Sequence, residues 1–271
     1  MHSKSNFSVL LSVYKKEDPG YLKQALESIW DWQTLKPTQI VIVRDGPLTK
    51  ELDKILTYWQ EKIPQVVFII SLEKNMGLAT ALNYGIKSCN QELIARMDTD
   101  DIALPERFEK QIQFMLANPD IAAASAQIEE WDEALTKKIN TRTLPTSSSE
   151  LTRFAKRRSP LTHPASIFRK SIVEKMGGYP ILQRAQDYGL WSLLLKNGYK
   201  LGNHPETLLK MRTGSDLLSR RGLSYFRHEY KLLCYQKEIG FLSGRGFLIN
   251  LFARSIIRLP VIQRLVYLIR K

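Results

Sequence analysis

The chain has 271 residues, 44% of them hydrophobic and 25% charged, which is the composition of a folded globular protein and excludes a disordered one. The net charge of +13 indicates an anionic partner: nucleic acid, an acidic membrane surface or a phosphorylated substrate. Cys89 and Cys234 belong to no CxxC or Cys/His cluster, so neither a zinc site nor a disulfide framework is expected. We expect no secretory signal and a reducing, cytoplasmic setting.

Apolar runs alternate with amphipathic helical patterns along the first 118 residues. The patterns predict strands at 7–14, 40–43, 66–70 and 93–97, and helices at 22–30, 52–59, 77–87 and 105–116. Strands separated by helices of this length form a parallel sheet with right-handed crossovers. This part of the chain is therefore predicted to be a Rossmann-like, doubly wound α/β unit with helices on both faces.

The alternation weakens after this unit. We expect a strand at 121–126, a polar loop at 141–150, a strand at 165–168 and a short helix at 171–176. A strongly apolar helix is then expected from Asp187 onward, after the turn made by Gly177 and Gly178.

Three aspartates, Asp98, Asp100 and Asp101, follow the fourth expected strand within four residues. Carboxylates at the end of a buried strand repel one another unless a cation or a set of donors lies among them. In extended backbone Asp98 and Asp100 project to the same side, so one Mg²⁺ or Mn²⁺ ion could bind them or Asp101, with nucleotide phosphates and water completing its coordination. The alternative is a solvated turn that caps the next helix.

Other polar residues follow the first two strands, where they are expected at the same edge of the sheet. Ser12 and Tyr14 end the first strand, and Asp45 ends the second. Tyr14 could stack on a base, while Asp45 could accept from an imide NH or a ribose hydroxyl. Asn75 opens a helix whose first amides could face a phosphate. A turn before Gly46 and a plain helix cap are the alternatives for Asp45 and Asn75.

Asp187 begins the segment DYGLWSLLLKNGY. Backbone amides at a helix N-terminus keep a carboxylate ionised, so this side chain is a candidate base for taking a proton from a hydroxyl. The alternative interpretation is a helix N-cap.

Three sequence segments in order, VRDG, MDTDD with LPERF, and QDYGLW after GGY, resemble the inverting glycosyltransferases of family two, which have the GT-A fold. The resemblance is closest to bacterial enzymes that assemble exopolysaccharide, capsule or lipopolysaccharide sugars, of the amylovoran and colanic acid type. It covers about residues 5–215, and it implies a nucleotide-binding half at about 5–118 and an acceptor half at about 119–215.

The resemblance implies roles for the residues at matching positions. Asp45 would bind the nucleotide base in a pocket lined by Ser12 and Tyr14, Asn75 would close over the nucleotide, and Asp187 would be the catalytic base. Asp98 and Asp100 would hold the donor, and Asp100 and Asp101 the metal.

The resemblance leaves the role of one residue undecided, and two other residues differ from the family pattern. His163, in THPASIFR, could touch phosphate or acceptor, although a structural role is favoured. Two positions depart from the family pattern: Arg44 replaces the first acid of the usual DDG turn, and Gln186 stands where many relatives carry Glu.

The implied reaction is a metal-dependent, inverting transfer of a sugar from a nucleotide-sugar to a hydroxyl of a glycan or polyprenyl-diphosphate-linked acceptor. UDP is the favoured nucleotide, with dTDP and GDP as alternatives. A phosphotransferase of the haloacid dehalogenase kind is disfavoured, because the cluster follows the fourth strand and Ile102 holds the position of its usual Thr or Val. A nucleic-acid-binding module is disfavoured because no aromatic platform or helix-turn-helix pattern accompanies the basic residues.

Residues 216–271 are expected to form a helical extension that is both basic and apolar. In its last part, 244–271, arginines interrupt the apolar residues, so a membrane span of ~20 apolar residues is not expected. Two short helices, separated at Pro260 and lying in the headgroup region of an anionic membrane, fit this pattern. The protein would then be peripheral on the cytoplasmic face of the inner membrane. Packing onto the catalytic domain or a homodimer contact are the alternatives.

Overall fold

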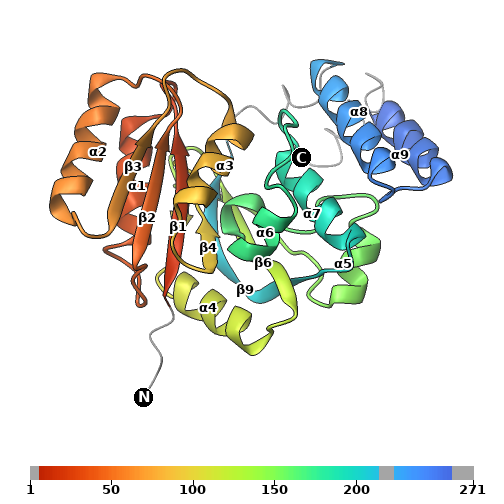
Figure 1. Cartoon of the computed structure of the whole chain (residues 1–271), viewed down its shortest axis with the longest axis horizontal. Coiled ribbons are helices and arrows are strands. Elements are labelled where there is room, and N and C mark those ends of the chain that lie inside the picture. Colours follow the sequence, from red (N-terminus) through yellow and green to blue (C-terminus); the bar gives the residue numbers. More distant parts are fainter. Residues whose placement is uncertain (1–5, 214–222, 258–271) are drawn as a thin grey trace.

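The computed structural model describes residues 6–213 and 223–257 (Figure 1). It contains one sheet of nine strands, in which eight follow the order β3-β2-β1-β4-β8-β6-β9-β5 and β7 pairs with the outer part of β6. Helices cover both faces of this sheet. The molecule therefore has the α/β class expected from the sequence.

The first half is the predicted parallel unit. Its elements are β1 (Phe7–Val13), α1 (Pro19–Ile29), β2 (Gln39–Arg44), α2 (Lys50–Lys62), β3 (Val67–Ser71), α3 (Leu78–Ser88) and β4 (Leu93–Arg96). β1 pairs in parallel with β2 and β4, and β2 pairs in parallel with β3. The carboxyl ends of these strands therefore lie at one edge of the sheet, where the polar residues were predicted to gather.

The second half begins with β5 (Ile102–Ala103) and α4 (Arg107–Ala117). It continues through β6 (Ile121–Trp131), β7 (Lys138–Arg142), α5 (Ser148–Phe154), the short 3-10 helix η1 (His163–Ala165), β8 (Ile167–Arg169), α6 (Lys170–Lys175), α7 (Gln186–Lys196) and β9 (Lys200–Arg212). β8 is antiparallel to both β4 and β6, whereas β9 is parallel to β6. Parallel pairing therefore dominates the first half and gives way to mixed pairing in the second.

Alternate residues of the central strand pack on opposite faces. Val9 and Leu11 of β1 join the core beneath α1, α2 and α4, while Leu10 joins the core beneath α3 and α7. The side chains on both faces are fully buried, as is Trp191 of α7. A strand that is apolar on both faces is typical of a sheet covered by helices on both sides. The strands that lead into the loops at the carboxyl edge are therefore packed against a core on each face.

Two helices follow the sheet: α8 (Leu223–Glu238) and α9 (Gly244–Ile257), which lie side by side next to α7 (Figure 1). Phe241 and Leu242, between them, pack with Leu233 of α8 and Ala155 after α5. The expected extension is therefore helical over the described residues 223–238 and 244–257. The expected boundary at 215 and the second tail helix after Pro260 lie outside the described residues. Within the described ranges, no helix is long and apolar enough to cross a membrane.

Candidate active site

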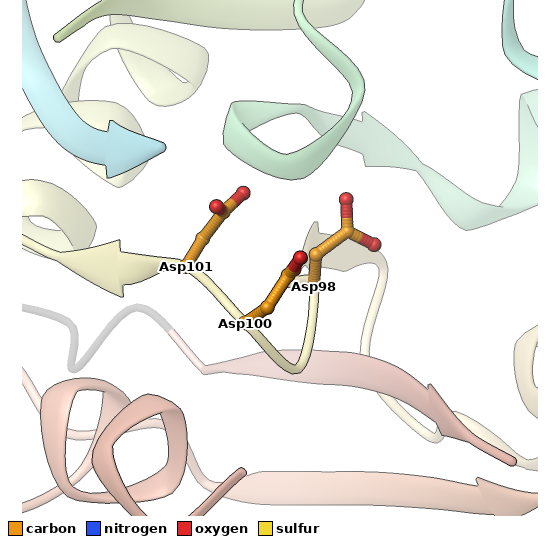
Figure 2. A group of neighbouring side chains, drawn as sticks. All are labelled: Asp98, Asp100 and Asp101. Atoms are coloured by element: carbon orange, nitrogen blue, oxygen red, sulfur yellow. The ribbon is translucent and has the colours of Figure 1, made fainter. Parts of the chain in front are cut away.

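The three clustered aspartates lie on the loop that joins β4 to β5. Asp98, Asp100 and Asp101 each offer a carboxylate oxygen within 4.8 Å of the others. All three side chains point to the same side of the loop (Figure 2). The loop forms here because buried β4 ends at Arg96, and its acids follow at once at the carboxyl edge of the sheet.

Two buried arginines hold this loop from below. Arg96 donates to Asp98 and, at 3.4 Å, to the carbonyl of Leu10. Arg107 of α4 donates to the carbonyls of Arg96 at 2.6 Å and Pro164 at 2.8 Å. Burial lowers the pKa of Arg107 to about 9, and the charge of Asp101 opposes this change. These guanidinium groups therefore position the loop and partly offset its negative charge.

The carboxylates nevertheless retain an uncompensated charge. Burial, followed by the charge of Asp98, raises the pKa of Asp100 to about 6. Burial and the charges of both neighbours also raise the pKa of Asp101 well above its ordinary value. A divalent cation among the three groups would remove this repulsion, and carboxylate oxygen is the ligand that Mg²⁺ and Mn²⁺ prefer. The residues present thus fit such an ion.

A cavity of about 270 Å³ opens above the three aspartates. It is lined by residues from both halves of the chain, namely Asp98, Asp100, Asp101, Arg142, Ser159, Leu161, Thr162, His163, Pro164, Asp187, Met211 and Arg212. Asp187, 86 residues away from Asp101 along the chain, is therefore on the wall of the same cavity as the acidic cluster. The two predicted carboxylate groups are brought together.

Asp187 lies in the first turn of α7. Burial raises its pKa to about 6, although hydrogen bonds from backbone amides of Tyr188 and Asp187 lower it. The charge of Asp98 adds to the upward shift. The result is a carboxylate that is more basic than an ordinary aspartate but still ionised at neutral pH, which is a property that suits a general base.

The residues predicted to bind the nucleoside lie at the carboxyl ends of β1 and β2 and in the loop before α3, along the same edge of the sheet as the acidic loop. Ser12 is buried in β1, opposite Val43 of β2, and Tyr14, which follows the strand, is 38% exposed. Burial and then the charges of Glu17 and Asp100 raise the pKa of Tyr14, so this ring is near the acidic cluster. An exposed aromatic ring in this position can stack on a planar base.

Asp45 fastens the loop before α3 to the end of β2. Its carboxylate accepts from the backbone amides of Met76 at 2.6 Å and Gly77 at 3.0 Å. The side-chain amide of Asn75 donates to the carbonyl of Asp45 at 3.3 Å. Gly46 makes this approach possible, because a Cβ there would lie 2.6 Å from the amide nitrogen of Asn75. The sequence indicated these residues separately, and the structure brings them together.

His163 has a buried hydrogen-bond partner as well as a place on the cavity wall. Its Nε2 lies 3.1 Å from the hydroxyl of Tyr179. Burial lowers its pKa to about 3, so the ring is neutral. This contact agrees with the structural role favoured from the sequence, and the ring also contributes to the cavity.

Two residues of this region were not predicted. Glu17, after β1, has its pKa raised to about 7 by burial, with a smaller contribution from Asp100, which places a fourth carboxylate beside the cluster. Arg212, at the end of β9, donates its backbone amide to Asp101 at 3.0 Å and its guanidinium to the carbonyl of Asp100. Glu17 lies in a polar segment that gave no pattern, and β9 itself was not predicted.

Residues 8–177 match the model of Glycosyl transferase family 2, a range that contains the parallel unit and the acidic loop, whereas Asp187, Met211 and Arg212 of the cavity wall lie beyond it. The chain belongs to this family and is a glycosyltransferase with the GT-A fold. Family membership excludes the haloacid dehalogenase and nucleic-acid-binding alternatives.

Curated relatives cover nearly the whole chain. The amylovoran biosynthesis glycosyltransferase AmsE of Erwinia amylovora is 39% identical over 98% of this chain and 98% of its own length. A UDP-Gal:alpha-D-GlcNAc-diphosphoundecaprenol beta-1,3-galactosyltransferase of Escherichia coli is 35% identical over 93% of this chain and 91% of its own.

Solved structures with low sequence identity share the fold. The mannosyltransferase PcManGT of Pyrobaculum calidifontis, in complex with GDP-Man and Mn2+, has a TM-score of 0.67 at 16% identity, covering 94% of this chain and 70% of that protein. S. aureus TarS 1-349 in complex with UDP-GlcNAc has a TM-score of 0.63 at 18% identity, covering 85% of this chain and 66% of that chain.

Proposed function

We propose that the protein transfers a sugar from a UDP-sugar to a hydroxyl of a lipid-linked glycan acceptor, in a metal-dependent single displacement that inverts the anomeric configuration. One observation carries the proposal: the base candidate Asp187 and the acids Asp98, Asp100 and Asp101 line one cavity. A cavity with a metal-compatible cluster on one wall and a basic carboxylate on another suits a donor on the first side and an acceptor on the second.

The donor is assigned to the parallel half. Ser12, Tyr14, Asp45 and Asn75 are proposed to bind the nucleoside, Asp98 and Asp100 the ribose and diphosphate region, and Asp100 and Asp101 the metal. Bound Mn²⁺ or Mg²⁺ would offset the charge that develops on the departing diphosphate, so no general acid is needed on that side. The carboxylate of Asp45 already accepts two amide hydrogens, which fixes its orientation for a third donor.

Asp187 is proposed to deprotonate the acceptor hydroxyl. As the hydroxyl oxygen bonds to the anomeric carbon, the bond from that carbon to the diphosphate oxygen breaks and the hydroxyl proton passes to the Asp187 carboxylate. Because attack comes from the face opposite the leaving group, the anomeric configuration inverts. The raised pKa of about 6 supports this role, since the group is a stronger base than an ordinary aspartate and is still ionised at pH 7.

The acceptor class and biological setting come from relatives. The names of AmsE and of the Escherichia coli galactosyltransferase, one acting in amylovoran biosynthesis and one on a diphosphoundecaprenol-linked sugar, support bacterial surface polysaccharide synthesis on a lipid carrier. UDP is the nucleotide of that galactosyltransferase and is therefore preferred to GDP or dTDP.

A peripheral position on the cytoplasmic face of the inner membrane completes the proposal. α9 exposes Leu248 (63%), Ile249 (57%) and Phe252 (69%) on consecutive turns, with Arg245 exposed on the turn before. An apolar helical stripe beside cationic side chains is the pattern of a helix that binds an anionic lipid surface. The net charge of +13 supports the same partner. A homodimer through this face is the competing arrangement.

A donor screen tests the reaction. The purified protein is incubated with Mn²⁺, membrane extract and a panel of UDP-, GDP- and dTDP-sugars, and the products are analysed by mass spectrometry and NMR. We expect one UDP-sugar to be consumed and an α-linked donor to give a β-linked product. An α-linked product, or transfer at full rate with EDTA present, would contradict the proposal.

A further inference from the structure

Four basic side chains gather beside the segment that leads into Asp187. Arg184 lies in that segment, and Arg227, His228 and Lys231 lie on α8 at positions that share one helical face. The segment and the helix are in contact, because Leu182 and Ala185, on either side of Arg184, pack with Leu232 of α8. The mutual influence of the charges agrees with this placement: after burial, the charges of Arg184, Lys231 and Arg227 lower the pKa of His228.

The cluster is not neutralised within the described ranges 6–213 and 223–257. Arg184, Arg227 and Lys231 are exposed, and none of them has an acidic partner at ion-pair distance in those ranges. The acid nearest along α8, Glu229, contacts Arg254 of α9 at 3.7 Å. Like charges placed together without counter-charge are destabilising, so an arrangement of this kind is expected to serve an anionic ligand.

Two local features mark the same place as unusual. Arg184 has a backbone φ of +64°, one of two such non-glycine values among the described residues. Strain of this kind costs on the order of 1–3 kcal/mol and tends to occur at functional sites. The Nδ1 atom of His228 is buried and has no hydrogen-bond partner in the described part of the chain. An unpaired buried polar atom calls for a bound water or ligand nearby.

The cluster is also close to the proposed base. Arg184 and Asp187 are three positions apart in the sequence, so their Cα atoms are at most about 11 Å apart. A single sugar ring and an attached diphosphate, together with the length of an arginine side chain, bridge such a distance. Beyond the cluster, α8 exposes Tyr230, whose ring lies 6.4 Å from that of Phe247 on α9, the helix with the exposed apolar stripe.

We propose that Arg184, Arg227 and Lys231, with His228 behind them, bind the diphosphate of a lipid-linked acceptor and thereby place its first sugar at Asp187. The inference takes the lipid-linked acceptor from the proposed function, and it adds the residues that recognise the diphosphate of that acceptor. The lipid chain then runs along α8 and α9 towards the membrane surface. An acceptor whose reactive sugar is attached directly to the diphosphate fits this spacing.

Direct binding to farnesyl diphosphate tests the site. The full chain is titrated by calorimetry with EDTA present, so that the diphosphate cannot bind through a metal at the acidic cluster. The variant Arg184→Gln/Arg227→Gln/Lys231→Gln is compared with the charge-matched control Lys54→Gln/Lys87→Gln/Lys175→Gln, whose residues are exposed on α2, α3 and α6. We expect the first variant to bind roughly tenfold or more weakly, because charge-assisted contacts are lost, and the control to bind as the wild type.

A second variant separates the guanidinium from the backbone. Arg184→Gly accommodates the positive φ and lacks the charge, so weakened binding there reports the side chain. Binding of UDP with Mn²⁺ is measured in every variant, and its retention shows an intact fold. If the wild type does not bind UDP with Mn²⁺, the proposed donor chemistry is refuted. The farnesyl diphosphate result does not depend on that outcome, because it is measured without metal.

Other probes distinguish the source of the phosphate. Equal farnesyl diphosphate binding by the wild type and the cluster variant, or equal wild-type affinity for farnesol, would overturn the inference. Loss of binding to phosphatidylglycerol vesicles with unchanged farnesyl diphosphate binding would also overturn it, since the cluster would then recognise membrane headgroups. Binding of inorganic pyrophosphate that weakens in the variant supports it.

Discussion

Two effects act in opposite directions on the pKa of Asp187 at the start of α7. Burial raises its pKa to about 6, and backbone amides of the first turn keep the shift from becoming larger. The group is then ionised at neutral pH and able to accept a proton. The same carboxylate in open solvent would be a weaker base by about two pKa units.

The pH dependence of transfer follows from this value. A base must be deprotonated to act, so the transfer rate at saturating donor and Mn²⁺ is expected to rise with pH through about 6 and to level off above 7. Initial rates between pH 5 and 8 measure the profile. A rate independent of pH across this range would argue against Asp187 as the base.

Metal binding should depend on pH at the acidic cluster. The pKa of Asp100 is raised to about 6, so this group is mostly protonated below pH 6 in the metal-free protein, and the pKa of Asp101 is also raised, by burial and the charges of its neighbours. Since a metal ligand must be deprotonated, Mn²⁺ affinity in the presence of UDP is expected to fall roughly tenfold or more between pH 7 and pH 5. Calorimetry in buffers of different ionisation enthalpy would detect the released protons. Equal affinity at both pH values is incompatible with these carboxylates as ligands.

Some residues of the site could be predicted from the sequence, and others could not. Asp98, Asp100 and Asp101 were predicted to cluster because three acids ended an apolar strand, and Asp187 was singled out because it opened an apolar helix. Glu17 escaped notice because a lone acid in a polar loop has no pattern, and its position beside Asp100 depends on how that loop returns to the sheet edge. Arg212 was missed because it belongs to β9, about 110 residues after the acids it contacts.

Among the elements, the turn after β2 links the predicted nucleoside residues. Gly46 has a φ of +87°, and a Cβ would meet the backbone at Asn75. Gly177 has a similar φ of +84°, but a Cβ added there would have nothing within 4 Å among the described residues, so the pair separates the cost of backbone strain from the cost of a clash.

Replacement of these glycines gives a stability prediction. Gly177→Ala is expected to lower the free energy of unfolding by about 1–2 kcal/mol through backbone strain alone. Gly46→Ala is expected to cost more, and to weaken UDP binding as well, because the loop that holds Asn75 must move away. Denaturant unfolding and UDP titration measure both effects. Equal destabilisation of the two variants with normal UDP binding would show that the close approach at Gly46 is unimportant.

The apolar pattern predicted the parallel strands but not all elements of the second half. The parallel strands were predicted because each is an unbroken apolar run, such as Val9 to Leu11. β9 was not predicted, since Pro205 and polar residues interrupt its alternation and its register with β6 shifts three times. The segment expected as a loop at 141–150 contains the end of β7 and the start of α5, because pairing with β6 gives order to a polar sequence.

At the scale of the whole molecule, the sheet presents the site at one edge while α8 and α9 stand beside α7 (Figure 1). The α/β class was predictable because strand–helix alternation is a local feature, and the GT-A fold was implied by the resemblance of three short sequence segments to a known family. The mixed pairing of the second half was not, since β8 and β9 find their partners only in the folded chain.

Membrane association is the prediction that belongs to this scale. Leu248→Ser/Phe252→Ser, on the exposed face of α9, is expected to reduce sedimentation with phosphatidylglycerol vesicles about tenfold or more, because burial of two large apolar side chains is lost. Leu116→Ser, an exposed leucine at the end of α4, serves as the matched control. Unchanged vesicle binding together with loss of a dimer in sedimentation velocity would identify the face as a contact between two copies.

The central claim, that Asp187 and the acidic cluster lining the same cavity serve one displacement reaction, is tested most directly by Asp187→Asn. This change preserves size and removes the base, so transfer is expected to fall on the order of 100- to 10,000-fold while the affinity for UDP and Mn²⁺ stays within about twofold of the wild type. Transfer near the wild-type rate, or an equal loss of donor binding, would contradict this mechanism.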